Sequence, residues 1–190
     1  NSGLIALSGA LVGDVGLLLA AGKREQAEVR ARKWATLFPG GNYYLEVQRP
    51  NGICGAAQDA GHSQQESLLL ATARLAADIG LPLVATHPVQ FLQADDYKAH
   101  EARVCIAEGY MLSDKRRPKT FSGQQYFKSQ AEMAELFADM PQALENAVEI
   151  ARRCNLSVEL GKNQLPRFPT PEGVTLDDFM AAESAAGLER

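Results

Sequence analysis

A short turn in the middle of the chain holds the residues whose types come closest to a catalytic or metal-binding group. The apolar run Leu81–Ala85 is too short for a helix and is typical of a buried parallel strand. The residues that follow it are Thr86, His87, Pro88, Val89 and Gln90. Parallel α/β folds keep their chemistry just beyond the carboxyl ends of their strands. This turn is therefore where a metal or a catalytic imidazole would lie.

A catalytic metal normally takes about three protein ligands and leaves one position open. The side chains that could serve as ligands are His62, His87, His100, Asp95, Asp96, Glu46, Cys54, Cys105 and Cys154. Only His87 lies at a strand end, while Pro88 has no donor atom for a metal and Gln90 is a poor substitute for histidine or a carboxylate. The sequence therefore predicts no metal here, and it predicts that His87 is a turn residue hydrogen-bonded to backbone.

Other catalytic arrangements find little support in the sequence. A Cys–His nucleophile pair would need a cysteine at a strand end, and the three cysteines are expected instead to be small core residues. The motifs GxxxxGK[ST], GxGxxG and HExxH do not occur. His100 is expected to lie on a helix and to be packed or capped by a neighbour, and His62 is expected to be exposed. The cysteines are odd in number and lack CxxC spacing, which indicates reduced thiols and a cytoplasmic setting.

A basic loop between Leu112 and Phe121 offers a second kind of chemistry. Its cations are Lys115, Arg116, Arg117 and Lys119. Such a run could contact the phosphates of DNA. The alternative is an ordinary solvated loop whose charge is partly offset by Asp114.

The composition excludes several classes of protein. The chain has 190 residues, 46% of them hydrophobic and 22% charged, which is ordinary for a globular domain with a real core. A net charge of -4 gives no general attraction to nucleic acid or to anionic membrane. No apolar run approaches the roughly 18 residues of a membrane span, and no signal peptide is visible. We expect an internal piece of a longer protein.

The first half of the chain is expected to form three rounds of strand, turn and helix. The expected strands are 4–7, 43–47 and 81–85, and the expected helices are 10–21, 24–38 and one that begins at a capping box, Ser63 to Glu66, and ends at Gly80. Arg49–His62 is expected to be a long loop. This pattern predicts an α/β fold with a parallel sheet, as a barrel first and as an open doubly wound sheet second.

The second half is expected to be mostly helical. Helices are expected at 95–108, at 129–137, from Pro141 to just before Asn155, and from Thr175 onward, with a capping box of Ser129 and Glu132 at the start of the second. Leu156–Leu160 could form a short strand, and the proline-rich segment Gly161–Gly173 is typical of an ordered connector.

An ordered series of segments gives the chain a family resemblance. The segments are Asn1–Asp14, Tyr43–Arg49, Leu81–Phe91, Asp95–Ile106, Ser129–Phe137, Pro141–Asn155 and Leu160–Pro169. Together they resemble the α (catalytic) subunits of bacterial replicative DNA polymerase III, and the match covers nearly the whole chain. The resemblance implies the C-terminal portion of a PHP (polymerase and histidinol phosphatase) domain at 1–150, in a distorted TIM-like (β/α)7 barrel. It implies a mostly helical connector at 151–190 that leads into the palm.

The resemblance also implies what has happened to the metal site. Members of the family that retain metal have a cysteine where this chain has Ala10. They have Thr-Asn-Asp-X-His after the third strand, so Pro88 replaces the carboxylate, Gln90 replaces the imidazole and His87 stands in place of asparagine. The resemblance therefore implies a degenerate, metal-free scaffold with no cofactor of its own.

The implied role is structural within a larger enzyme. The resemblance implies a proofreading exonuclease subunit and other replicative holoenzyme subunits as partners, DNA contact through the parent protein, and no membrane. The parent would be a DNA-directed DNA polymerase whose Mg²⁺ lies in the palm, beyond Arg190, so this piece is not expected to be catalytic. The rival hypothesis is a metal-dependent phosphoesterase or 3′–5′ exonuclease working from the same turns.

Overall fold

The structure is a computed structural model that describes residues 3–50, 60–162, 166 and 168–189. It divides into a first unit that ends at Cys154 and a second unit that begins at Asn155. The two units are described separately. In the described part of the chain, no helix is both long and apolar enough to cross a membrane.

A three-stranded parallel sheet lies at the centre of the first unit, in the order β1-β2-β3. The strands are β1 (Ala6–Leu7), β2 (Tyr43–Gln48) and β3 (Leu83–Thr86). Tyr43 pairs with Ala6 of β1, and Gln48 pairs with Thr86 of β3. The expected strands and their parallel α/β arrangement are thus confirmed, with β1 shorter than predicted. A closed barrel is not seen among the described residues.

Three helices pack on the sheet and bury its apolar side chains. They are α1 (Asp14–Ala20), α2 (Arg24–Leu37) and α3 (Ala60–Ile79). Their shared core holds Val15, Ala27, Ala31, Tyr43, Leu45, Leu75 and Ala76. Because side chains alternate along a strand, Tyr43 and Leu45 share one face of β2, while Glu46 and Gln48 share the other. The second face therefore carries polar groups at its carboxyl end.

The start of α1 is set by a tight turn that follows β1. Gly9 has φ +77° and Ala10 has φ +46°, both in the left-handed region. A Cβ built on Gly13 would lie 1.7 Å from the Ser8 carbonyl oxygen, and one on Gly16 would lie 2.0 Å from the Ala10 carbonyl oxygen. The backbone of α1 thus packs directly on the turn. The helix begins at Asp14 and not at Ala10 because the residues before Asp14 form this turn.

The prediction of a capping box at Ser63 is wrong. The helix α3 already includes Ala60, so Ser63 lies inside it and Arg49–His62 is not a loop throughout. Positions 51–59, which include Cys54, are outside the described residues, as is the side chain of His62.

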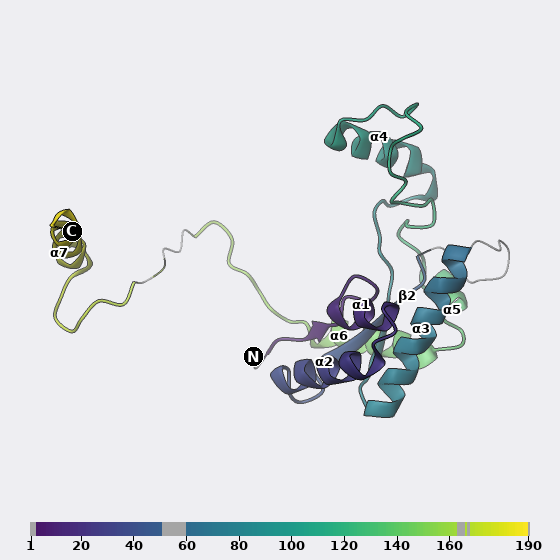
Figure 1. The fold of residues 1–190 in the computed structure, drawn as a ribbon, viewed down its shortest axis with the longest axis horizontal. Coiled ribbons are helices and arrows are strands. Elements are labelled where there is room, and N and C mark those ends of the chain that lie inside the picture. Colours follow the sequence, from purple (N-terminus) through teal and green to yellow (C-terminus); the bar gives the residue numbers. More distant parts are fainter. Residues whose placement is uncertain (1–2, 51–59, 163–165, 167, 190) are drawn as a thin grey trace. The chain divides into compact units, whose positions relative to one another are not determined.

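Residues 91–127 form an arm that leaves the sheet and returns to it (Figure 1). The helix expected at 95–108 is confirmed there as α4 (Tyr97–Glu108), preceded by the 3₁₀ turn η1 (Ala94–Asp96). The two limbs of the arm meet at a parallel bridge between Phe91 and Tyr126.

The arm has a small aromatic core of its own. The ring centroid of His100 lies 5.3 Å from that of Phe91 and 4.8 Å from that of Phe121. The ring of Phe91 also packs against Tyr97, with centroids 5.9 Å apart. His100 is buried by these contacts, which confirms the expectation that a neighbour packs against it.

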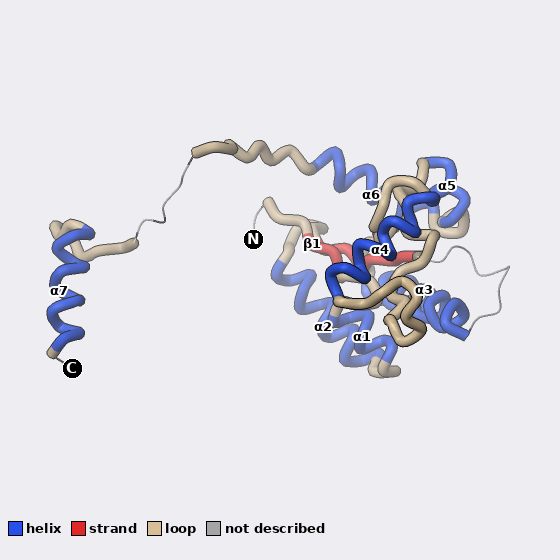
Figure 2. The backbone as a smooth tube through the Cα atoms, turned by 90° about the horizontal axis from the view of Figure 1, so that it is seen from above, coloured by secondary structure: helices blue, strands red, loops and turns tan. Residues whose placement is uncertain are grey.

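Two further helices complete the first unit, α5 (Gln130–Leu136) and α6 (Pro141–Arg153). The expected capping box at Ser129 and Glu132 is confirmed, since each side chain accepts from the other residue's backbone N–H. Figure 2 places α6 beside the strands, on the side away from α1 and α2. The amide of Asn146 on α6 donates to the carbonyl of Leu83 on β3 at 2.7 Å.

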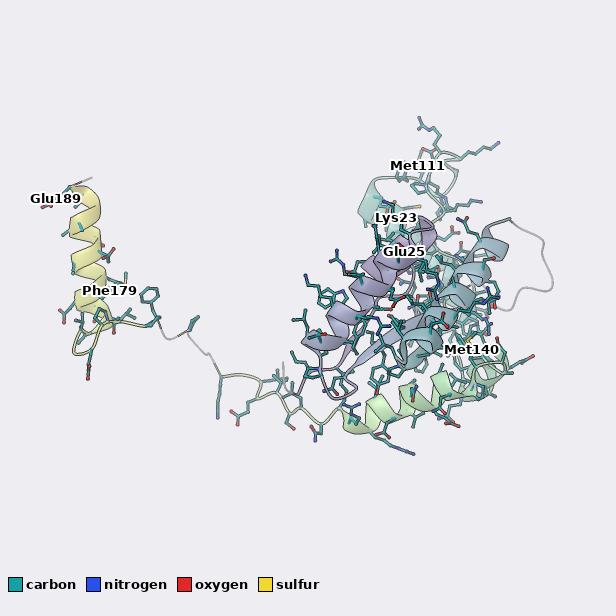
Figure 3. The ribbon with its side chains drawn as sticks, turned by 60° about the horizontal axis from the view of Figure 1, so that its bottom comes forward. Lys23, Glu25, Met111, Met140, Phe179 and Glu189 are labelled. Atoms are coloured by element: carbon teal, nitrogen blue, oxygen red, sulfur yellow. The ribbon has the colours of Figure 1, made fainter. Side chains whose placement is uncertain are left out.

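The second unit holds the helix α7 (Leu176–Leu188), whose first turn is capped by the Thr175 hydroxyl accepting from the Asp178 N–H. Phe179, labelled on α7 in Figure 3, packs against Phe168 with ring centroids 5.5 Å apart. In the segment expected to be an ordered connector, positions 163–165 and 167 lie outside the described residues.

The possible strand at Leu156–Leu160 is wrong. This segment is exposed, and it is not paired with any strand of the described residues. An alternating apolar pattern makes a strand only where a neighbouring strand is present.

Candidate functional site

A network of hydrogen bonds joins the carboxyl ends of the three strands, centred on the carboxylate of Glu46. The backbone N–H of Gly9 donates to Oε2 of Glu46 at 3.0 Å, and the amide of Gln48 donates to Oε1 at 3.0 Å. The hydroxyl of Thr86 also donates to Oε1, and it accepts from Gln48 at 2.9 Å. The N–H of Glu46 itself donates to the Ser8 hydroxyl at 2.9 Å. We call these five residues the strand-end network.

The hydrogen bonds of the strand-end network hold neighbouring elements of the sheet together. Glu46 is only 9% exposed, so its oxygens need donors to offset the loss of water. The donors from Gly9, Gln48 and Thr86 are neutral, and they come from the turn after β1, from β2 and from β3. A carboxylate that accepts from three elements holds those elements in register.

The turn after β3 binds the returning limb of the arm. Nε2 of His87 lies 2.9 Å from the Gln124 carbonyl oxygen, and the N–H of Gln90 donates to the Gln125 carbonyl at 2.8 Å. The amide of Gln125 donates to the Pro88 carbonyl at 3.3 Å. The prediction that His87 is a turn residue hydrogen-bonded to backbone is confirmed.

The environment of His87 fixes its protonation. A carbonyl can only accept, so the contact with Gln124 places a proton on Nε2 of His87. Its other ring nitrogen, Nδ1, is buried and has no hydrogen-bond partner among the described residues. Burial lowers the pKa of His87, and the nearby charge of Lys128 lowers it further against the opposing hydrogen bond to Gln124. The neutral imidazole therefore suits this turn.

The three positions implied to have lost metal ligands lie at the strand ends. Ala10 is buried in the turn after β1, and its methyl group offers no donor atom. Pro88 and Gln90 follow β3, and their contacts with Gln125 use their backbone atoms. The oxygens of Glu46 are already bound by neutral donors. The donor set at these strand ends is therefore a poor fit to a metal.

The other candidate ligands do not gather at the strand ends. Asp95 and Asp96 lie in η1, where Asp96 accepts from the Gln93 N–H, and His100 lies among the aromatic rings of the arm. Within the described ranges, no group of three or more His, Cys, Asp or Glu side chains is placed to hold a metal.

The expectation that the cysteines are small core residues has a mixed outcome. It is confirmed for Cys105, which is buried on α4, and it is wrong for Cys154, which is exposed. Cys154 follows the last residue of α6, at the end of the first unit, where less of the fold is available to cover it.

Arg49 is a central residue that the sequence did not single out. It follows β2 directly, its side chain is 5% exposed, and its guanidinium carbon lies 5.2 Å from the centroid of the Phe137 ring. It donates to both oxygens of Asp139, at 2.6 and 2.9 Å, and to both oxygens of Glu66, at 2.5 and 3.1 Å. It also donates to the Leu136 carbonyl at 2.6 Å. The hydrogen bonds to Asp139 and Glu66 raise the pKa of Arg49.

The cations of the basic loop differ in their surroundings. Arg117 pairs with Glu101 of α4 at 2.7 Å, and its side chain is 14% exposed. This pair holds the pKa of Glu101 below its usual range. Arg116 is 88% exposed and contacts the neighbouring carboxylate of Asp114. Lys115 and Lys119 are exposed.

The chain matches known proteins along its whole length. A family model described as "PHP domain" matches residues 1–50. Over 190 residues, the chain is 50% identical to the DNA polymerase III subunit alpha of Neisseria meningitidis serogroup A, covering 100% of this chain and 16% of the relative. Over 187 residues, it is 50% identical to the same subunit of Pseudomonas aeruginosa, covering 98% of this chain and 15% of that relative.

A more distant relative gives the same result. The DNA polymerase III subunit alpha of Escherichia coli K12 is 43% identical over 189 residues, which are 100% of this chain and 15% of the relative. The resemblance inferred from the sequence is thus confirmed. The chain spans about 16% of the length of the first of these relatives, which is consistent with the expected piece of a longer protein.

Proposed function

We propose that this chain is a segment of the α subunit of a replicative DNA polymerase III, and that it acts there as a scaffold without catalysis of its own. The whole protein would be a DNA-directed DNA polymerase in the cytoplasm. Its catalytic carboxylates and Mg²⁺ would belong to the palm, in sequence beyond Arg190. The identity of 43–50% over nearly all of this chain supports the assignment.

The strand-end network is the observation that carries the scaffold role. Glu46 uses its carboxylate to bind Gly9, Gln48 and Thr86, which belong to three different elements. The turn after β3 uses its polar groups to bind the arm. Apart from Nδ1 of His87, the donors and acceptors named here are occupied inside the fold, which suits a role in holding the shape of the domain more than binding and releasing a substrate.

The proposed architecture is part of a distorted TIM-like (β/α)7 PHP barrel at 1–150 and a connector toward the palm at 151–190. Three parallel strands, with helices between them, support the barrel. The polar face of β2 would point into the mouth of such a barrel. The change of unit between Cys154 and Asn155 lies close to the proposed boundary.

The proposed partners are a proofreading exonuclease subunit and other subunits of the replicative holoenzyme, with DNA bound by the parent protein. A pull-down with the complete α subunit and the purified exonuclease subunit tests the docking role. We expect capture of the exonuclease by the complete subunit and its loss when the PHP domain is deleted. Capture that survives this deletion would refute the proposed docking role.

A metal-dependent phosphoesterase is the second candidate, because Glu46 and His87 both lie at strand ends and Nδ1 of His87 has no partner within the described part of the chain. Elemental analysis after purification without chelators separates the two candidates. The scaffold role predicts less than stoichiometric zinc and manganese, unchanged by His87→Ala. Stoichiometric metal that is lost in His87→Ala would establish the second candidate.

A further inference from the structure

The arm places its cations in two different settings, and this difference points to a binding surface. Arg117 turns inward: besides its pair with Glu101, its Nε donates to the Leu112 carbonyl at 3.3 Å. These two bonds tie the basic loop to α4 and to the start of the loop itself. Arg117 is thereby used in holding the loop in place.

The other three cations of the loop are exposed to solvent. They are Lys115, Arg116 and Lys119, and residues 115–119 contain no acidic side chain. Figure 3 shows side chains around Met111 extending into open space at the outer end of the arm. Pro118 restricts the backbone between Arg117 and Lys119. We call Lys115, Arg116 and Lys119 the arm tip.

Arg116 is already oriented for recognition of an oxyanion. Its Nε and one terminal nitrogen, Nη2, donate to Asp114 at 3.2 and 3.0 Å, and its backbone N–H donates to the same carboxylate at 2.9 Å. The guanidinium therefore has a preferred plane, although it is 88% exposed. A planar guanidinium with donors left over suits the oxygens of a phosphate.

We propose that the arm tip binds the phosphodiester backbone of a nucleic acid. Three exposed cations on one short loop can pair with neighbouring phosphates, whereas the net charge of the whole chain, -4, gives no general attraction to nucleic acid. Arg117 is not part of the contact. The inference stands on the contacts of the arm and does not depend on the proposed function.

The test is a binding titration with the whole 190-residue chain and fluorescent DNA, single-stranded and duplex, at several salt concentrations. The variant is Lys115→Gln/Arg116→Gln/Lys119→Gln. We expect its affinity at low salt to fall about tenfold or more. The salt slope should fall by up to about 2.7 for duplex and about 2.1 for single strands, from about 0.9 and 0.7 per phosphate contact.

A matched variant controls for charge alone. Lys23→Gln/Arg32→Gln/Lys33→Gln removes two lysines and one arginine from exposed positions at the start of and along α2. It should keep both the affinity and the salt slope. Because all six side chains are exposed, both variants should melt close to the unmodified chain, and the melting curve checks this.

Three results would overturn the proposal. The first is an unmodified chain that does not bind DNA even at low salt. The second is an equal loss in the two triple variants, which would show a general charge effect. The third is displacement of DNA by polyglutamate at the same charge concentration with the same dependence on the arm tip, which would make the tip a site for acidic proteins.

Discussion

Charged residues have opposite roles in two regions of the first unit, the arm at 91–127 and the body, which is the rest of the described residues of that unit. In the body, Arg49 and Glu46 are buried, and their partners lie far away in the sequence: Asp139 for Arg49 and Gly9 for Glu46. In the arm, Arg116 and Arg117 find their partners within the arm itself. A charged side chain whose partner is distant in the sequence stabilises the tertiary fold, whereas one whose partner lies in the same arm orders only that arm. The strand ends therefore suit a structural role, and the arm tip suits contact with a partner.

The largest expected effect comes from removing Arg49. Arg49→Ala would leave the carboxylates of Glu66 and Asp139 without their shared cation and would uncover Phe137. We expect a loss of about 3–5 kcal/mol in the free energy of unfolding, measured by urea denaturation. The matched arm variant Arg116→Ala, whose side chain is exposed, should unfold at nearly the same urea concentration as the unmodified chain. Similar losses in both variants would erase the contrast between body and arm.

The second-largest loss of stability is expected when a methyl group is added where α1 packs on the turn after β1. Gly16→Ala puts a methyl group 2.0 Å from the Ala10 carbonyl oxygen, so the helix or the turn must move. We expect a loss of about 1–3 kcal/mol in thermal or urea unfolding. Gly123→Ala in the arm is the matched control, because its Cβ would have 3.7 Å to the ring of Tyr97. Equal tolerance at the two glycines would contradict the tight packing of α1.

The strand-end network can be tested at its centre. Glu46→Gln keeps the size of the side chain but replaces one acceptor oxygen by a donor that faces other donors. We expect a loss of about 1–3 kcal/mol on urea unfolding, with no comparable loss in Glu108→Gln, an exposed residue at the end of α4. A stable Glu46→Gln chain would show that the carboxylate is dispensable, and the scaffold role would lose its main support.

Lowering the pH should destabilise the arm more than the body of the first unit. Burial lowers the pKa of both His87 and His100. The charge of Lys128 lowers the pKa of His87 further. The charge of Arg103 lowers the pKa of His100 further, while the charge of Glu101 opposes this change. A histidine whose pKa is lowered in the folded state contributes fully to the free energy of unfolding only above its ordinary pKa of 6.5. That contribution decreases as the pH falls below 6.5. Amide exchange in residues 91–127, corrected for its intrinsic pH dependence, should therefore rise between about pH 7 and 5.

The strands of the body provide the internal control for this pH effect. Exchange at β2, whose residues include no histidine, should change little over the same range. The variants His87→Gln and His100→Gln should each remove part of the response of the arm. Simultaneous loosening of β2 and the arm would show that the two regions do not respond separately.

The elements were predictable from the sequence because their signals are local. The apolar runs indicated the three strands, and the helical spacing of Ala27 and Ala31 indicated α2. The same local signals failed where a longer-range effect decides. Ser63 looks like a cap but lies within α3, and Leu156–Leu160 alternates like a strand but has no strand beside it among the described residues.

The site was predictable only in part, because its contacts join distant parts of the chain. The sequence placed His87 in a turn after a strand, but it could not show that Gln124 and Gln125 return to that turn. The pairing of Arg49 with Asp139 spans 90 residues, and nothing in either local sequence announces it. The position of Arg49 directly after a buried strand is the signal that could have marked the arginine itself, though not its partner.

The hydrogen bond from Asn146 to the Leu83 carbonyl bears on self-association. End strands of a sheet expose backbone groups to which a foreign strand can add, and aggregation commonly starts there. At β3, a strand that approaches Leu83 meets an amide already bound to that carbonyl. A foreign strand would therefore have to displace the Asn146 side chain of α6 before it could pair with β3 at Leu83.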